Sequence, residues 1–523
     1  MKRLKNNISH IPEQIRNSHF VVLFLCAFVF IFCIFMYSDT TRYGISGNDD
    51  DTFINFNFEK YSVKDIFTQN ILFNNAIKTY YRPLLAISFM IDNCIAESPA
   101  VMHTTNIMLH ALCSVLIFIF FKRYFFDTSI SFFAAILFAA HPINIFTAAW
   151  IPGRNDSLLC VFFILSLIFF IEYLKKDKTV FLVFNFTFFA VALFIKEIAV
   201  IFPLMYLFVW FKENKKINRN FCIIFGIQFL LIITFFILYE KVSEKVISIE
   251  YFSMVLNNIK TLFDYYSAAI LFKIHFSKYT SMQNLIGGII SICAVLLFSF
   301  CSKSDWKEKI LYFCFPVLML LISLIAGQMF FQASRAYIPL MFMIIVFVSF
   351  LTKYFDLKIV YTVLVALILL SSYMTLKYQK VFENEYIYFK TIDEEKPNYE
   401  IVMANLYSYN LLKYGKFEQA EAKAKEIGQI TNYGNPYNLY VLSVISMYKQ
   451  NFMQAMEYLE QIPNFDDDVY TKLTICYAEI GDEQKANYYY DIVLKLNGNN
   501  VEKTEELINR EKQCFVKKSK VSY

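Results

Sequence analysis

Three features that are common in other proteins are missing from this sequence, and each absence narrows its class. The 11 cysteines include no Cys-x-x-Cys pair, which argues against a disulfide framework and against a cysteine-ligated metal site. The 49 basic and 44 acidic residues nearly balance, so the composition implies no nucleic-acid partner. No small-residue cleavage site follows the first apolar run, which predicts an uncleaved membrane span.

Long apolar runs dominate what is present. Hydrophobic residues make up 57% of the chain, and the mean hydropathy is +0.44. Runs of about 18 or more apolar residues identify membrane-spanning helices. The pattern predicts an all-α, polytopic membrane bundle of about 11 spans, at residues 20–37, 101–121, 130–149, 157–173, 179–195, 198–211, 221–239, 285–301, 310–326, 336–351 and 359–376.

The basic residues that flank these runs predict the orientation of the chain. Lys and Arg accumulate in cytoplasmic segments, and here they cluster in the segments that share a side with residues 1–19. The three short segments on the other side carry one basic residue each, namely Arg154, Lys196 and Arg335. With 11 spans, the chain after the last span lies outside, on the same face as the loop after the first span.

Two of the predicted outside segments are long. Residues 38–100 contain Asp49-Asp50-Asp51 and then Tyr81-Arg82-Pro83, which opens an apolar piece too short to span. Residues 240–284 mix Lys and Glu with aromatic residues, a composition that suits the lipid headgroup region. We therefore expect both segments to lie at the membrane surface.

The composition becomes more polar after Tyr378, which predicts a membrane domain at residues 1–377 and a helical domain at residues 378–523. Alanines of the second domain recur after about 35 and then about 31 residues, close to the tetratricopeptide period of 34: Ala420, Ala455 and Ala486. The pattern predicts a tetratricopeptide-type α-solenoid with a concave surface for peptides or partners. A plain α-hairpin stalk is the alternative, and the basic tail from Lys512 onward is expected to be loosely ordered.

Ionisable residues in the membrane part are costly and usually line a cavity or pathway. Here they gather, together with the polar Asn106, at the predicted outside ends of different spans: Asp49–Asp51, His103, His110, His141, Arg154, Asp156, Lys196, Glu197 and Arg335. Taken singly, an acidic triplet is more often a solvated turn, a helix-end cation reaches to lipid headgroups, and His110 is interpreted as a packing residue. Their convergence on one face instead predicts a site for an anionic headgroup beside an acid or base.

The same residues form an ordered series of short motifs. They are Asp49-Asp50-Asp51-Thr52-Phe53-Ile54 with Asn57, Tyr81-Arg82-Pro83-Leu84, His103-x-x-Asn106-x-x-x-His110-Ala111, His141-Pro142, Gly153-Arg154-x-Asp156, Lys196 with Pro203, and Arg335-x-Tyr337-Ile338-Pro339. The series resembles the GT-C membrane glycosyltransferases, in the branch that joins such a core to tetratricopeptide repeats, as in the animal TMTC proteins and many bacterial homologues. The sequence departs from the family pattern at two points. The spacing from Arg335 to the following proline is one residue shorter than in the family, and Lys196 is followed by Glu.

The resemblance implies an enzyme that moves a sugar, such as mannose or another hexose, from a polyprenyl-phosphate donor to a protein hydroxyl. The base is then an acidic residue of the first outside loop, Asp49 or Asp50, with Asp49 slightly favoured. The donor phosphate is expected to contact residues from several spans: Arg82, His103, His141, Arg154, Asp156, Lys196 and Arg335. This arrangement suits a single displacement with inversion. An alternative is a Mg²⁺ or Mn²⁺ ion held by Asp51 together with Asp49 and Asp50.

Two other classes of function fit the same sequence. One is a non-enzymatic membrane scaffold or assembly factor, and the other is a GT-C enzyme that acts on a glycan or lipid acceptor. The coincidence of carboxylates and cations on one face favours the protein glycosyltransferase, with the repeats selecting a protein acceptor. Heavy use of Lys, Asn, Ile and Phe suggests an AT-rich bacterial genome. We therefore expect a multi-pass protein of the bacterial inner membrane with the repeats outside, or of the endoplasmic reticulum in a eukaryote.

Overall fold

All of the described secondary structure is helical, which confirms the predicted all-α fold for this part of the chain. The chain divides into two compact units, Met1–Asn384 and Glu385–Tyr523. The computed structural model describes residues 19–47, 50–54, 60–69, 81–213, 216–242, 258–272, 274–276, 281–301, 314–320, 332–395, 401–463 and 467–518.

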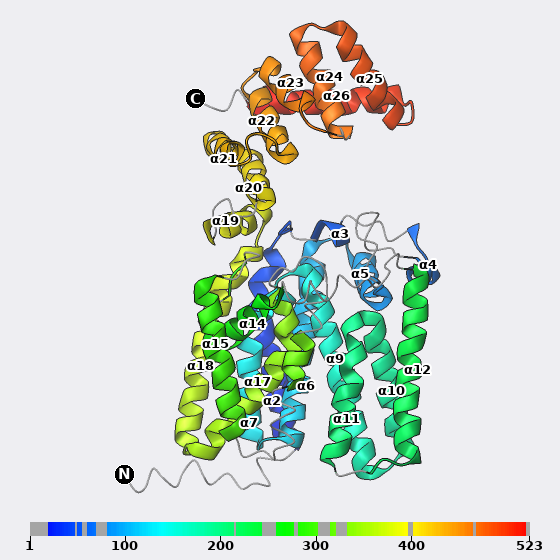
Figure 1. Cartoon of the computed structure of the whole chain (residues 1–523), viewed down its shortest axis with the longest axis vertical. Coiled ribbons are helices and arrows are strands. Elements are labelled where there is room, and N and C mark those ends of the chain that lie inside the picture. The colour runs from blue at the N-terminus through cyan, green and yellow to red at the C-terminus, as the bar shows by residue number, and fades with distance from the viewer. Residues whose placement is uncertain are drawn as a thin grey trace. The chain divides into compact units, whose positions relative to one another are not determined.

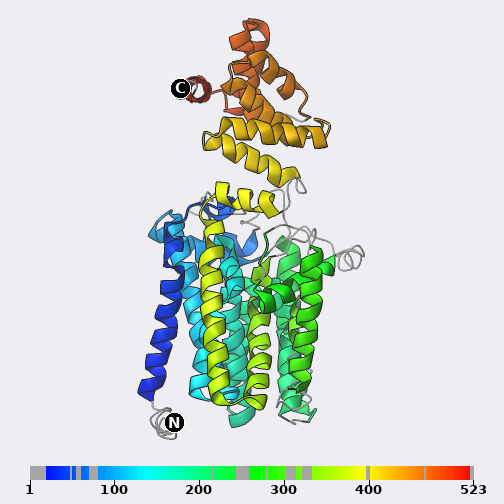
Figure 2. The same cartoon turned by 90° about the vertical axis from the view of Figure 1, so that its left-hand side faces the viewer.

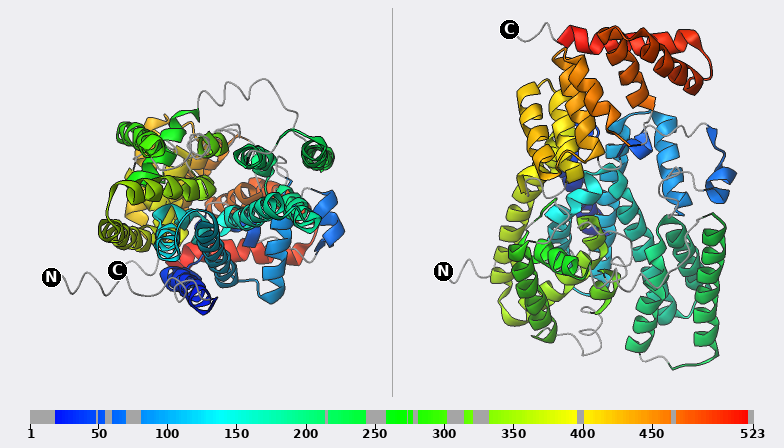
Figure 3. Two further views of the ribbon diagram at one scale, coloured as in Figure 1. Left: turned by 90° about the horizontal axis from the view of Figure 1, so that it is seen from below. Right: turned by 45° about the horizontal axis from the view of Figure 1, so that its top comes forward.

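Seven helices of the described residues are long and apolar enough to cross a membrane. They are α2 (His19–Tyr37), α6 (Pro99–Tyr124), α9 (Arg154–Lys176), α12 (Arg219–Val242), α15 (Met282–Cys301), α17 (Tyr337–Tyr354) and α18 (Leu357–Tyr378). They run roughly parallel to one another within the membrane unit in Figure 1, and the left view of Figure 3 shows them end-on. The predicted membrane bundle is confirmed.

The remaining predicted spans correspond to broken or shorter helices. Helix α7 (Thr128–Ala140) is followed, after a bend of 49°, by η3 (Pro142–Asn144) and α8 (Ile145–Ala148), and this pair would count as an eighth span. The other short pieces are α10 (Thr179–Ile195), η5 (Glu197–Ile201) and α11 (Phe202–Lys212). Of the predicted span 310–326 the structure describes only residues 314–320, which are helical.

Proline and glycine explain the sharp turns between α7 and α9. Pro142 has no N–H group to donate, so it ends the hydrogen-bond ladder of α7. The Asn144 side chain then donates to the Phe138 carbonyl (2.5 Å), which satisfies a carbonyl at the helix end. At Gly153, just before α9, a Cβ atom would lie 1.9 Å from the Phe146 carbonyl oxygen, so only glycine fits.

Helices α9 and α17 lie at the centre of the bundle. Within the apolar part of each, 72% of the residues are buried in the protein, against 17–22% for α2, α12 and α18. The latter three therefore present most of their surface to lipid. The cysteines differ in the same way: Cys33, Cys113 and Cys160 are buried, whereas Cys222 and Cys293 are exposed on outer helices.

The first loop and the end of the last membrane helix meet at one end of the bundle. Helix α18 continues into η7 (Gln379–Phe382), which contacts η1 (Ser38–Arg42) after α2, and the Gly44 N–H donates to the Glu383 carbonyl (3.0 Å). The helices α3 (Asp50–Ile54), α4 (Val63–Thr68), α5 (Pro83–Ile95) and α14 (Lys260–Leu271) lie toward the same end (Figures 1 and 2). We call this end of the membrane unit the loop face.

The C-terminal unit is a stack of antiparallel helix pairs. After α19 (Glu385–Glu395) come α20 (Ile401–Lys413) with α21 (Phe417–Ile430), α22 (Pro436–Tyr448) with α23 (Phe452–Glu460), and α24 (Asp467–Ile480) with α25 (Glu483–Leu496). The repeated alanines are buried in the second helix of each pair: Ala420, Ala455 and Ala486. Left-handed residues turn the pairs, Gly415 at φ 74° and Gly481 at φ 88°, with Gln450 at φ 61° in the middle pair.

The described residues end in α26 (Val501–Lys518), which corrects one prediction. The basic composition predicts a loose tail from Lys512 onward, but the described residues remain helical to Lys518. Phe515 is only 3% exposed, and its ring lies 4.9 Å from that of Tyr448. Burial of this aromatic side chain provides an anchor that the charge pattern does not show.

Candidate functional site

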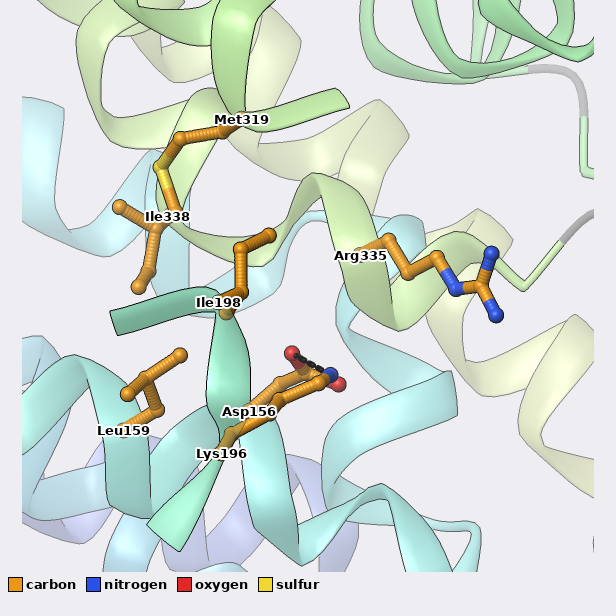
Figure 4. Close-up of a pocket in the computed structure, with 7 residues that line it drawn as sticks. All are labelled: Asp156, Leu159, Lys196, Ile198, Met319, Arg335 and Ile338. Atoms are coloured by element: carbon orange, nitrogen blue, oxygen red, sulfur yellow. Dashed lines mark hydrogen bonds and ion pairs between the residues drawn. The ribbon is translucent and has the colours of Figure 1, made fainter. Parts of the chain in front are cut away.

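Short turns at the loop face bring polar residues of different helices together. The turn after α7 contacts η6 (Ala333–Ala336), and α14 contacts η6 as well. A small pocket opens between α9, η5 and the start of α17, and its enclosed space of about 10 Å³ is roughly that of one water molecule. It is lined by Asp156, Leu159, Lys196, Ile198, Met319, Arg335 and Ile338 (Figure 4).

The pocket has an apolar side and a polar side. Figure 4 shows the side chains of Leu159, Ile198, Met319 and Ile338 on one side, and the polar ends of Asp156, Lys196 and Arg335 on the other. One carboxylate and two cations leave a net positive charge. Such a lining places an apolar wall beside cations that can bind an anionic group.

Lys196 is held at the polar side by the first turn of α9. Its Nζ donates to Asp156 Oδ1 (2.6 Å) and to Asn155 Oδ1 (3.1 Å), and the side chain is 12% exposed. Burial lowers the pKa of Lys196, and the Asp156 carboxylate opposes that shift. The second carboxylate oxygen of Asp156 is buried and has no hydrogen-bond donor among the described residues. Asp156 therefore keeps acceptor capacity for a ligand hydroxyl.

Glu197, the residue that departs from the family pattern, pairs with Arg82. The guanidinium of Arg82 donates from Nε to Oε2 (2.9 Å) and from Nη2 to Oε1 (2.5 Å). Burial raises the pKa of Glu197, but the Arg82 guanidinium outweighs it and holds the pKa at about 2. The pair joins the start of α5 to the turn that carries Lys196. Arg82 therefore contacts a carboxylate at the rim of the site.

Arg335 approaches the pocket from η6. Tyr265 of α14 lies close to it: burial raises the pKa of the Tyr265 hydroxyl, and the Arg335 guanidinium partly opposes that shift. Figure 4 shows the guanidinium of Arg335 directed away from Met319 and Ile338. Arg335 and Lys196 thus line one pocket from two different turns, and their shared role toward a ligand stays a prediction.

Arg154 is placed differently from Lys196. Its side chain is 0% exposed, and its guanidinium donates to the Asp92 carboxylate, the Ser88 carbonyl (3.1 Å) and the Met102 carbonyl (2.9 Å). Its Cζ also lies 4.1 Å from the centre of the Phe89 ring. All three guanidinium nitrogens therefore donate within the protein. Arg154 therefore lacks the arrangement that we expect of a phosphate ligand. Its hydrogen bonds link α5, α6 and α9.

Asn106 completes the Arg154 cluster. Its Oδ1 accepts from Arg154 Nε (2.8 Å), while its Nδ2 donates to the carbonyls of Trp150 (2.9 Å) and Ile151 (3.1 Å). A single amide thus holds both the guanidinium and the turn before α9. That turn leads into α9, which carries Asp156. The contacts of Arg154 and Asn106 therefore hold the end of α9 that lines the pocket.

Two of the histidines are engaged by backbone and packing. His141 Nε2 lies 3.0 Å from the Ala269 carbonyl, and its Nδ1 accepts from the Ile143 N–H (3.3 Å), so it connects α14 to the turn after α7. His110 contacts the Tyr337 hydroxyl through Nδ1 (2.7 Å) and the Ala139 carbonyl through Nε2 (3.1 Å). The packing interpretation of His110 is thereby confirmed.

His103 has a less complete set of contacts. It is 1% exposed, and within the described residues neither ring nitrogen makes a hydrogen bond of standard geometry. The ring lies edge-on to Tyr43, with the centroids 6.2 Å apart. His103 therefore faces the first loop at the point where the chain continues toward Asp50.

The acidic stretch is described only in part. Asp49 lies outside the described residues, as does the side chain of Asp51. Asp50 is 1% exposed, and its Oδ2 accepts from the Ser46 N–H (2.7 Å) and the Ser46 hydroxyl (2.6 Å). In the same helix Phe53 stacks on Phe89 at 4.3 Å, which places α3 over the Arg154 cluster.

No group of three or more His, Cys, Asp or Glu is placed to hold a metal ion within the described ranges. Because Asp49 and the side chain of Asp51 are not described, the metal alternative stays a prediction.

Two carboxylates and a histidine of this region were not predicted as site residues. Asp92 pairs with Arg154, and its Oδ1 also accepts from Thr105 (2.7 Å). Asp264 of α14 lies 3.2 Å from His275, and both are almost fully buried. A lone histidine within an aromatic-rich loop is the signal that marks His275, whereas Asp92 carries no signal in the local sequence.

Known proteins resemble the part of the chain that contributes Asp156, Leu159, Lys196 and Ile198 to this pocket. The family model described as dolichyl-phosphate-mannose-protein mannosyltransferase matches residues 84–239. This range includes Arg154, Asp156 and Lys196, whereas Asp50 and Arg335 lie outside it. The match confirms the resemblance to membrane glycosyltransferases over that part of the chain.

Three relatives illustrate the similarity. Protein O-mannosyl-transferase TMTC2 of Mus musculus is 37% identical over 94 residues, which cover 18% of this chain and 11% of the relative. TMTC1 of Homo sapiens is 38% identical over 88 residues (16% and 10%), and TMTC4 of Homo sapiens is 32% identical over 122 residues (20% and 16%). The chain therefore matches between about a tenth and a sixth of the length of these relatives.

Proposed function

We propose that this protein is a glycosyltransferase that moves a sugar from a polyprenyl-phosphate donor to a protein hydroxyl at the loop face. The similarity of residues 84–239 to protein mannosyltransferases supports the class of reaction and makes mannose the first sugar to test. The C-terminal unit, Glu385–Tyr523, which we call the repeat unit, then selects the acceptor.

The pocket around Asp156 and Lys196 is the observation that carries the proposal. Its apolar side offers a surface to the start of a polyprenyl chain, and Lys196 and Arg335 offer charge-assisted hydrogen bonds to phosphate. The free acceptor oxygen of Asp156 suits a sugar hydroxyl, which needs an acceptor once it leaves water. A scaffold protein has no need for this combination.

The transfer is a single displacement at the anomeric carbon of the sugar. The acceptor hydroxyl oxygen forms a bond to that carbon as the bond to the phosphate oxygen breaks, and the phosphate leaves with the bonding electrons. Asp49 or Asp50 takes the proton of the hydroxyl, and Lys196 and Arg335 stabilise the charge that develops on the phosphate. The two hydrogen bonds from Ser46 hold the Asp50 carboxylate in place.

The structure changes the roles that we assign to the other cations. Arg154 and Asn106 act as positioning residues, since they fix the turn before α9 without an N–H group left for a ligand. The pair of Arg82 and Glu197 positions the turn that presents Lys196. His103 keeps its proposed place beside the donor, and His141 fixes α14 against the site.

A direct assay tests the proposal. The purified full-length chain in lipid nanodiscs is incubated with a panel of polyprenyl-phosphate sugars and Ser/Thr-containing peptides, and mass spectrometry detects glycosylated products. We expect transfer by the wild type, loss of transfer in Asp49→Asn or Asp50→Asn, and normal transfer in Asp39→Asn, an exposed aspartate of η1. No transfer with any donor would favour the membrane scaffold. Transfer only to glycan or lipid acceptors would instead favour the GT-C enzyme with a non-protein acceptor.

Two further measurements complete the assignment. If EDTA abolishes transfer and Mg²⁺ or Mn²⁺ restores it, the acidic stretch holds a metal ion. We also propose that the loop face lies on the outside of the inner membrane. Protease added to spheroplasts should then release fragments cut after residue 384, and complete protection would reverse the orientation.

A further inference from the structure

The last helix of the repeat unit folds back over the stack. Gly498 and Asn499 have left-handed backbone conformations (φ 70° and 60°), and their N–H groups donate to the carbonyls at the end of α25. The chain therefore reverses direction after α25. Helix α26 then contacts α22 and α24, the first helices of the second and third pairs, in addition to α25 (Figure 1).

One face of α26 makes these contacts. Thr504 is fully buried, Ile508 packs against the core of the repeat unit, and Phe515 is 3% exposed. These positions and Glu511 are separated by four, three and four residues, which places them on one side of a helix. Most of the remaining described side chains of α26 are exposed. The helix is thus attached by a single stripe.

The surface under α26 has matching chemistry, and we call it the A face. It consists of Tyr440 and Tyr448 on α22 and Lys472 and Glu479 on α24. Tyr448 packs against the Phe515 ring, Lys472 Nζ lies 3.6 Å from Glu511, and Glu479 lies 2.5 Å from Lys512 Nζ. An aromatic anchor and two ion pairs of opposite polarity therefore define both the position and the direction of the bound helix.

The A face continues beyond the end of α26. Tyr409 on α20 is 40% exposed, and its ring centroid lies 6.2 Å from that of Tyr440. Exposed tyrosines of this kind are common in protein-binding surfaces. The covered part of the face and its exposed continuation therefore form one surface.

We propose that the A face is a binding site for an amphipathic helix, and that α26 is its built-in occupant. The external partner is a helical segment of a protein with an Ile-x-x-Glu-x-x-x-Phe pattern, which binds Tyr448 and Lys472 after α26 has been displaced. The single contact stripe of α26 selects a helix over an extended peptide. The inference concerns the repeat unit alone and does not depend on sugar transfer.

Displacement is feasible because α26 is held by few contacts. Only the short segment 497–500 links it to α25, and such a tether gives it an effective concentration in the millimolar range. A partner must overcome this concentration, so only a segment with better contacts or a second attachment site opens the face. The effective concentration of α26 therefore sets the minimum affinity that a partner needs in order to bind.

The test uses the full-length chain and a fluorescent peptide of residues 501–518, with binding followed by fluorescence anisotropy. The wild-type chain should bind the peptide weakly, because its own α26 competes. The variant Phe515→Ala should bind it roughly 100-fold more tightly, because the competing helix has lost its anchor. A chain with Glu505→Ala, which alters an exposed position of α26, should behave as wild type.

A second variant covers the case in which Phe515→Ala fails to fold. The chain with Glu511→Lys repels Lys472 and should release α26, and the wild-type peptide should then bind because it supplies the missing glutamate. A peptide with Phe515→Ala should not bind either variant. If any folded chain of either variant fails to bind the wild-type peptide, α26 is a fixed part of the fold and the proposal is wrong.

Discussion

The Arg82 guanidinium and the Glu197 carboxylate form a two-point ion pair across 115 residues of sequence, and this pair secures the turn that carries Lys196. The carboxyl side chain of Glu197 is 34% exposed, so solvent limits what the pair contributes, and we expect about 1 kcal/mol at neutral pH. Glu197→Gln should lower the unfolding temperature of the membrane unit slightly.

The pH dependence of that difference has a defined sign. The folded-state pKa of Glu197, about 2, lies below the unfolded value of about 4.3. The stabilisation is therefore fully present above about pH 4.3 and is lost as the pH falls toward 2. Thermal unfolding of wild type and Glu197→Gln in detergent should differ at pH 7 and converge at low pH. An equal difference at every pH would mean that packing, and not the charge, is responsible.

Arg154 should matter more for stability than for substrate affinity. Removal of one partner of a buried ion pair leaves an uncompensated charge, and Arg154→Met should destabilise the membrane unit by about 3–5 kcal/mol. Thermal unfolding of Arg154→Met, Asp92→Asn and the double variant measures the coupling. We expect the double variant to be less destabilised than the sum of the single variants. Normal stability of Arg154→Met combined with a raised donor KM would restore the role of phosphate ligand.

Much of the architecture follows from local sequence, because long apolar runs and buried alanines at a repeated spacing identify helices directly. The grouping of Asp156, Lys196 and Arg335 also follows, since the distribution of basic residues assigns them to one face. The difference between Arg154 and Lys196 does not follow. Both are isolated cations at helix ends, and only the packing of Ser88 and Asp92 of α5 against Arg154 removes it from the pocket. The Arg82–Glu197 pair is hidden for the same reason, since its partners are far apart in sequence.

Gly153 should be essential for the turn before α9. A Cβ atom there would lie 1.9 Å from the Phe146 carbonyl oxygen, a backbone atom that cannot move alone. Gly153→Ala should therefore destabilise the membrane unit by at least about 1–3 kcal/mol. Gly226 in α12 is the matched control, because a Cβ atom there meets nothing within 4 Å. We expect Gly226→Ala to be neutral or stabilising by at most about 1 kcal/mol. Equal unfolding temperatures for the two variants would contradict the close approach.

Lys196 should act in the transfer step, and the two ends of α9 provide a controlled test. At the loop face Lys196 pairs with Asp156 (2.6 Å), and at the opposite end Lys176 pairs with Glu172 (2.8 Å). Loss of a group that stabilises charge in the transition state typically costs about 100–1000-fold in kcat. Lys196→Met should therefore lower kcat by that factor while the protein stays folded, whereas Lys176→Met should leave kcat unchanged.

Arg335→Lys separates charge from geometry in the same pocket. A lysine keeps the positive charge but loses the fixed fork that binds two phosphate oxygens at once. We expect a moderate fall in kcat/KM, smaller than that of Lys196→Met, measured with the same lipid-linked donor. If both pocket variants retain full activity although the aspartate variants lose it, the donor phosphate binds elsewhere. The apolar side formed by Leu159 and Ile338 would then have no lipid chain to contact, and the pocket would be a packing defect between α9 and α17.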